Sequence, residues 1–141
     1  MTESTKNFTA EERAAMKARA KEAKVNATKE AAAANQREKI AEFSGLDREL
    51  CERISEIAEK YAPALDPKTF YGAPGWARDG KVVFFFQPAG LYKVRYGTLG
   101  FQETATLDAG AIWPTSFAII EWNAAVEKQV TALVKKVAAV A

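Results

Sequence analysis

The amino-acid sequence predicts an α+β fold, a two-layer sandwich in which an antiparallel sheet is packed by a helix on its N-terminal side and by a C-terminal helix. Most aromatic residues and glycines lie within residues 67–101, where turn signals recur. Apolar residues recur every three or four positions on either side of this block, as in amphipathic helices. Consecutive strands with short loops and flanking helices form an antiparallel sheet with its helices on one face.

A helical N-terminal extension is expected to precede this domain. Residues 1–37 are rich in Ala, Lys and Glu, and we expect the α+β domain to span residues 38–141. Thr9 and Glu12 match a capping box, which predicts that a helix begins at Ala10. Large apolar side chains are few in this segment, so its helix gains little from packing.

Two further helices are expected before the sheet. The first spans residues 28–43, with Gly45 as its C-terminal cap. The second begins at Asp47 as N-cap and ends at about Tyr61, before Pro63. Its apolar stripe consists of Leu46, Leu50, Ile54, Ile57 and Tyr61. Such a stripe predicts a helix that packs on a core.

Six strands are expected in the aromatic block and after it, at residues 68–71, 76–78, 81–86, 91–96, 98–106 and 116–120. Asp79-Gly80 predicts a type I′ hairpin turn, and a bend is expected at residues 72–75. Residues 82–86 have no polar position, which indicates a strand covered on both faces or one that exposes aromatic side chains at a binding surface. The segment at 98–106 is expected to be an edge strand.

The final helix is expected to begin after Asn123, a favourable N-cap, and to end near Ala139. Its apolar stripe consists of Val126, Val130, Leu133, Val134 and Val137.

The composition excludes several classes of function. The chain has 141 residues, a net charge of only +2 and no histidine. The near balance of charge argues against a strongly basic nucleic-acid binder. Without histidine, Ser-His and Cys-His nucleophile pairs cannot form, so we expect a protein that is not an enzyme. Cys51 is the single cysteine, and we interpret it as a packing residue in a reducing, cytoplasmic compartment. No apolar run approaches the length of a membrane span.

Aromatic and cationic residues on the expected sheet form the candidate ligand-binding site: Tyr71, Trp76, Tyr92, Lys93, Arg95, Tyr96 and Trp113. Lys93 and Arg95 would point the same way along their strand and could hold an anionic group. Aromatic side chains next to cations would also suit a single-stranded nucleic acid. The alternative is that these rings fill the core and leave their polar tips at its edge.

Four carboxylates share one face of the helix at residues 47–61: Glu49, Glu52, Glu56 and Glu59. Such a row could bind a hard cation, including iron. The alternative is the ordinary polar outer face of a helix that packs on a sheet.

The segment Tyr71-Gly72-Ala73-Pro74, together with FFFQPAGLYKVRYGTLGF at residues 84–101, resembles the YdhG-like family. The resemblance covers residues 38–140, and Ala73 stands where the family has Met. It implies a two-layer α+β sandwich of unknown function. Some members are labelled iron chaperones because their helix–sheet–helix plan is similar to that of frataxin.

Three functions follow as expectations. The first is non-enzymatic binding of an unknown small molecule or protein through the aromatic and cationic face. The second is frataxin-like iron binding through the glutamate row, iron being the one cofactor considered. The third is a nucleic-acid accessory role for the N-terminal extension. Nine basic and six acidic residues precede Ile40, so this part of the chain carries the positive excess. No membrane partner is expected, and a homodimer is left open.

Overall fold

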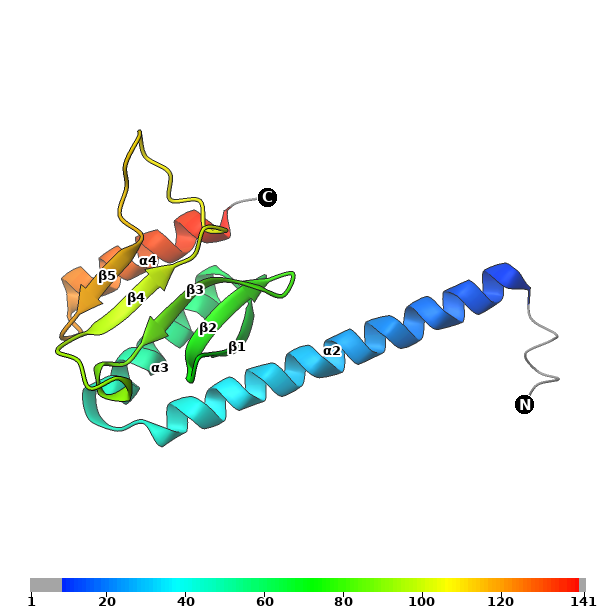
Figure 1. Cartoon of the computed structure of the whole chain (residues 1–141), viewed down its shortest axis with the longest axis horizontal. Helices are drawn as coiled ribbons and strands as arrows, with labels where there is room; N and C mark the ends of the chain where they lie inside the picture. The colour runs from blue at the N-terminus through cyan, green and yellow to red at the C-terminus, as the bar shows by residue number, and fades with distance from the viewer. Residues whose placement is uncertain (1–8, 140–141) are drawn as a thin grey trace. The chain divides into compact units, whose positions relative to one another are not determined.

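The protein is an α+β sandwich, as the sequence predicts. The computed structural model describes residues 9–139, apart from the side chains of residues 22, 25 and 26 (Figure 1). In chain order the elements are α2 (Ala10–Glu42), α3 (Gly45–Tyr61), β1 (Asp66–Phe70), β2 (Ala73–Arg78), β3 (Lys81–Gln87), the 3₁₀ helix η1 (Ala89–Leu91), β4 (Gly97–Phe101), β5 (Ser116–Ile119) and α4 (Ala124–Ala138). The chain divides into two compact units, Met1–Ala31 and Ala32–Ala141. The last turns of α2 therefore belong to the second unit, whereas the sequence places the boundary after residue 37.

Helix α2 begins where the capping box predicts. The backbone N–H of Glu12 donates to Oγ1 of Thr9 at 3.1 Å, which satisfies one of the free amides of the first turn. The expectation of a separate helix starting at Thr28 is wrong, because α2 continues without a break to Glu42. No Gly or Pro interrupts this Ala-rich stretch, and the Thr28 hydroxyl donates back to the Lys24 carbonyl within the helix.

Helix α3 follows after a sharp reversal at Gly45, whose φ of +59° lies in the left-handed region. Its N-cap is Ser44, so the prediction of Asp47 as N-cap is wrong. Asp47 lies in the first turn instead, and its carboxylate accepts from the backbone N–H of Gly90 at 3.0 Å. The predicted apolar stripe is buried at Leu50, Ile54 and Ile57, and it is joined by Cys51 and Ala58.

The five strands form one antiparallel sheet in the order β1-β2-β3-β4-β5. Asp79 and Gly80 both have positive φ, which confirms the predicted type I′ turn between β2 and β3. A second turn of this kind, at Tyr71-Gly72, joins β1 to β2. The bend expected at residues 72–75 is therefore wrong beyond Gly72, because residues 73–75 already pair with β1.

No strand forms at residues 91–96, contrary to expectation. This segment continues from η1 and closes on itself, with the N–H of Val94 donating to the Ala89 carbonyl at 3.0 Å. Lys93 has a φ of +53°, which breaks any extended run. The next strand, β4, lies between β3 and β5, so it is a central strand and not the edge strand that was expected.

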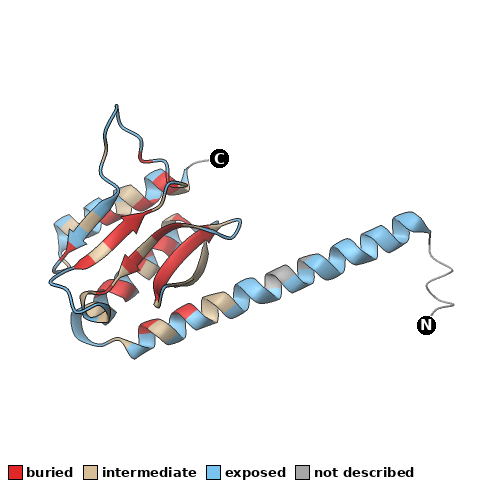
Figure 2. Cartoon of the chain, viewed as in Figure 1, coloured by how far each residue is buried: buried red, intermediate tan, exposed pale blue. Residues whose placement is uncertain are grey.

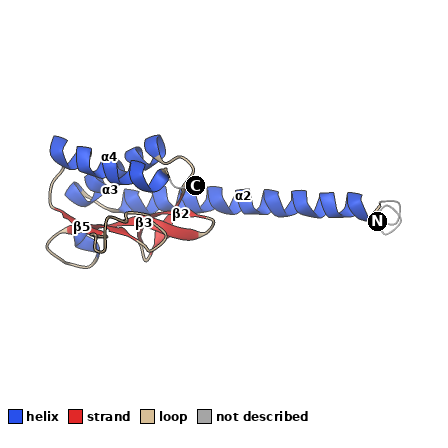
Figure 3. Ribbon diagram, turned by 90° about the horizontal axis from the view of Figure 1, so that it is seen from above, coloured by secondary structure: helices blue, strands red, loops and turns tan. Residues whose placement is uncertain are grey.

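The helices cover one face of the sheet, where α3 and α4 form a layer (Figure 3). Trp76 and Phe84 stack in the core between sheet and helices, with ring centroids 4.8 Å apart. Asn123 caps α4 as predicted, its Oδ1 accepting from the N–H of Val126 at 2.9 Å. Val130, Val134 and Val137 of the predicted stripe are buried. Burial is concentrated in the strands and in the inner sides of α3 and α4 (Figure 2).

The opposite face of the sheet carries no α-helix within residues 32–139, and only a short helical turn lies on that side (Figure 3). Phe85 lies on this face between two glycines, since it pairs with Gly75 on β2 and with Gly100 on β4. A Cβ atom on Gly100 would lie 2.3 Å from Cζ of Phe85, so the ring lies flat against the Gly100 backbone. Both glycines are buried although no helical layer covers them, and the side chains closest to Gly75 are those of Phe70 and Val82.

Candidate functional site

The meander topology gathers several segments at one end of the sheet. The β1–β2 turn and the β3–β4 loop lie there, whereas the β2–β3 turn and the β4–β5 loop lie at the other end (Figure 1). The Asp47–Gly90 hydrogen bond fastens the start of α3 to the same end. Ile119 pairs with Gly97 at the first residue of β4, which brings Ile120 there as well. We name this region the tyrosine end; it comprises Leu46, Asp47, Tyr71, Gly72, residues 88–96 and Ile120.

Exposed hydrophobic side chains are concentrated at the tyrosine end. In residues 32–139 the exposed large hydrophobic residues are Leu46, Tyr71, Tyr92, Val94, Tyr96, Ile112 and Ile120. All of them except Ile112 belong to the tyrosine end, and Tyr71 is 78% exposed. Scattered exposed apolar side chains are normal on a protein surface, whereas a concentration of them marks an interaction site.

Local contacts order this surface. The hydroxyl of Tyr92 donates to the Tyr71 carbonyl at 3.0 Å and ties the loop to the neighbouring hairpin turn. The Tyr71 ring packs edge-on against Phe70, with centroids 4.7 Å apart. The guanidinium of Arg95 lies 5.2 Å from the centroid of the Tyr96 ring. Lys93 and Arg95 are the charged residues of the loop, and both are positive.

The structure brings together five of the seven candidate ligand-binding residues, namely Tyr71, Tyr92, Lys93, Arg95 and Tyr96. Trp76 does not share their surface, because it is 2% exposed and stacked in the core. Trp113 is half-buried in the β4–β5 loop at the other end of the sheet. The sequence interpretation did not include Leu46, Val94 or Ile120, since apolar residues next to helices and strands are ordinarily assigned to a core.

The glutamate row remains on the surface of α3. Glu49, Glu52, Glu56 and Glu59 are all exposed, and Glu52 pairs with Arg48 at 3.6 Å. Among the side chains that the structure describes, no three of Cys, Asp or Glu come together as metal ligands would. Iron binding by this row stays a prediction.

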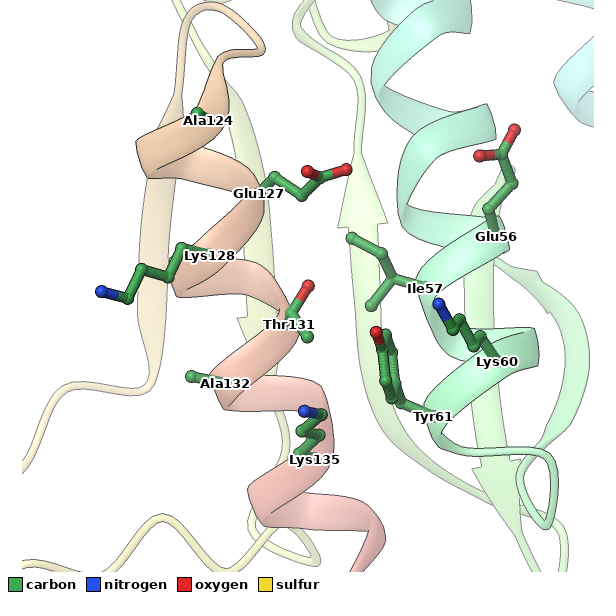
Figure 4. Close-up of a pocket in the computed structure, with 10 residues that line it drawn as sticks. All are labelled: Glu56, Ile57, Lys60, Tyr61, Ala124, Glu127, Lys128, Thr131, Ala132 and Lys135. Atoms are coloured by element: carbon green, nitrogen blue, oxygen red, sulfur yellow. The ribbon is translucent and has the colours of Figure 1, made fainter.

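A cleft of about 560 Å³ lies between α3 and α4 (Figure 4). Tyr61 lies at its centre, with the ammonium groups of Lys135 and Lys60 at 4.6 and 5.2 Å from the ring centroid. Glu127 and Thr131 point into the gap from α4, whereas the side chain of Lys128 points away (Figure 4). The cleft therefore combines charges of both signs with one aromatic ring.

Cys51 offers no reactive thiolate. Burial raises the pKa of its thiol to about 12, and the carboxylates of Asp47 and Glu52 act in the same direction. A thiol with such a pKa stays protonated at neutral pH, so it is not a nucleophile. Its complete burial confirms the interpretation of Cys51 as a packing residue.

Fold and surface define a small α+β domain with a five-stranded meander, one helical layer and an exposed aromatic end. Comparison with protein-family models, with curated proteins and with solved structures found no match. The resemblance to the YdhG-like family therefore stays a prediction. In the part of the chain that the structure describes, no helix is both long and apolar enough for a membrane span.

Proposed function

We propose that this protein is a non-enzymatic binding domain whose tyrosine end docks a partner protein. The observation that carries the proposal is the concentration of exposed hydrophobic side chains there, with Ile112 as the one exception in residues 32–139. Tyr and Arg are enriched in protein–protein interfaces and in their energetic hot spots, and the tyrosine end presents Tyr71, Tyr92, Tyr96 and Arg95.

The internal contacts of the tyrosine end support this role. Tyr92 is bonded to Tyr71, and Gly90 is bonded to Asp47, so two loops and a helix start are fixed to one another. A surface that is ordered before binding loses less conformational entropy when the partner docks. The positive side chains of Lys93 and Arg95 favour a partner that presents a carboxylate next to apolar side chains.

Site-specific photo-crosslinking tests the proposal in cells that express the protein. The photoreactive residue p-benzoylphenylalanine is placed at Tyr71 or at Val94, and in a matched control at Ile112. We expect one discrete protein adduct from both test positions and none from the control. Arg95→Glu should reduce the adduct formed from Tyr71, since it reverses one charge of the surface.

Two outcomes would contradict this function. Equal labelling from Tyr71 and from Ile112 would show that the adduct reflects exposure alone. Unrelated adducts from Tyr71 and Val94 would show that the tyrosine end does not act as one surface.

A further inference from the structure

A second cleft, of about 310 Å³, lies between the last turns of α2, helix α3 and the β1–β2 hairpin. Two polar side chains that line it, Gln36 and Trp76, are each only 2% exposed. Buried polar groups ordinarily find a hydrogen-bond partner, so the bonding of these two side chains shows what the cleft can hold.

The amide of Gln36 is fixed in one orientation. Its Nε2 donates to the carbonyl of Lys68 at 3.0 Å and to the carbonyl of Gly75 at 2.8 Å. Both partners are acceptors, so both N–H groups are used and Oε1 must point away from them. Among the side-chain hydrogen bonds of residues 9–139, none involves this Oε1.

The indole of Trp76 carries one donor and no acceptor. Its ring stacks on Phe84, and its Nε1–H has no hydrogen-bond partner within the described chain. Every fully enclosed side-chain N or O atom of the described residues has a partner. The free Nε1–H of Trp76 and the free Oε1 of Gln36 must therefore reach open space, and the open space that both residues border is this cleft.

We propose that this cleft binds a small neutral molecule with a carbonyl oxygen next to an N–H, as in a primary carboxamide or a lactam. The carbonyl accepts from Nε1–H of Trp76, and the N–H donates to Oε1 of Gln36. Arg37 and Glu59 line the cleft with one charge of each sign, which favours a ligand without net charge. The remaining lining is largely apolar, from Ala58, Ala62, Pro63, Leu65 and Pro67.

The cleft has the character of a small-ligand site. A mostly apolar lining with a few placed polar groups is typical of such sites, and its volume is at the lower end of their range. The half-buried hydroxyl of Ser55 on α3 adds one further polar group. This inference is independent of the tyrosine end, because the two regions share no residue.

NMR titration of the full chain with nicotinamide tests the inference, with nicotinate as the matched control. Nicotinate has the same ring but carries a carboxylate, which cannot donate to Oε1 of Gln36. Trp76→Phe assigns the Trp76 indole signal among the three tryptophans. We expect nicotinamide to shift this signal with a Kd in the millimolar range, as for other very small ligands, and nicotinate to leave it in place.

Two variants locate the binding. Ser55→Leu fills the cleft and should abolish the shift, whereas Thr131→Leu in the α3–α4 cleft should leave it unchanged. Thermal unfolding of both variants confirms that they are folded. An unmoved Trp76 signal at ~50 mM nicotinamide, about tenfold above the low-millimolar Kd expected for such a ligand, would overturn the inference. An equal shift with nicotinate, or a shift that persists in folded Ser55→Leu, would overturn it as well.

Discussion

The carboxylate of Asp47 accepts a hydrogen bond from the backbone N–H of Gly90, joining the first turn of α3 to the loop after β3 across 3.0 Å. A Cβ on Gly90 would lie 2.4 Å from the same carboxylate oxygen, so the loop approaches the helix as closely as a glycine permits. Helix layer and sheet are thereby fixed to each other at the tyrosine end.

We expect Asp47→Ala to lower the free energy of unfolding by about 1 kcal/mol, because a charge-assisted hydrogen bond is lost. Asp47→Asn keeps an acceptor at the same place and should lose less. Urea denaturation measures both variants. Hydrogen exchange of the Gly90 amide gives the local effect, and an unchanged exchange rate in Asp47→Ala would show that the bond does not hold the loop.

Gly100→Ala should destabilise the sheet by about 1–3 kcal/mol, because its methyl group would collide with the Phe85 ring. The collision disappears when the ring is absent. Phe85→Leu therefore should relieve much of the loss, and a double-mutant cycle with the two substitutions should give a clear coupling energy. Additive effects of the two substitutions would contradict the packing of ring on glycine.

Gln36→Leu should cost about 1–3 kcal/mol of stability, since the two carbonyl oxygens of Lys68 and Gly75 lose a shared donor. Arg37→Leu, at the exposed neighbouring position, serves as the control and should change stability by no more than about 0.5 kcal/mol. Chemical denaturation compares the two. Similar values for both variants would mean that Gln36 does not hold α2 to the hairpin.

Stability should fall above pH 9 because of Cys51. Its pKa is about 12 in the folded protein against an ordinary value of 9.0, so the unfolded chain loses this proton first as pH rises. Ionisation of Cys51 does not lower the free energy of unfolding below pH 9. Between pH 9 and about pH 12 the free energy of unfolding decreases by at most about 1.4 kcal/mol per pH unit. Cys51→Ala should flatten this dependence in denaturation curves between pH 8 and about 10.5. Parallel curves for both proteins would exclude Cys51 as the cause.

Much of the fold follows from local sequence signals. The stripe of α3, the Asn123 cap and the Asp79-Gly80 turn each depend on residues close together in the chain. The cap and the turn are found where the sequence places them, and so is the stripe except at Leu46, which is exposed. The segment at residues 91–96 was mistaken for a strand because its alternating apolar residues mimic one. The N–H groups of Leu91, Lys93 and Val94 donate to carbonyls within the loop and not to a neighbouring strand, and Tyr92 and Tyr96 are exposed.

The candidate site could be predicted only in part, because composition does not separate core rings from surface rings. Tyr71 and Trp76 are five residues apart, yet the first is exposed at a hairpin turn and the second is enclosed under the helices. The pairing of Phe70 with Ala73 leaves Tyr71 in the turn, whereas the register of β2 and β3, which shifts between Trp76 and Ala77, sets the neighbours of Trp76. The cleft beside Trp76 depends on α2. Gln36 of this helix contacts Lys68 and Gly75 of the hairpin, which are more than thirty positions away in the sequence.

Three side chains, those of Phe85, Phe70 and Val82, shield peptide bonds that many sheets protect with a whole additional layer. Phe85 lies across the middle of the sheet, where both of its neighbours lack side chains. The ring of Phe70 adjoins that of Phe85 on this side, with centroids 5.0 Å apart. Any molecule that rests on that side would meet two aromatic rings, and its affinity would depend on stacking area more than on hydrogen bonds.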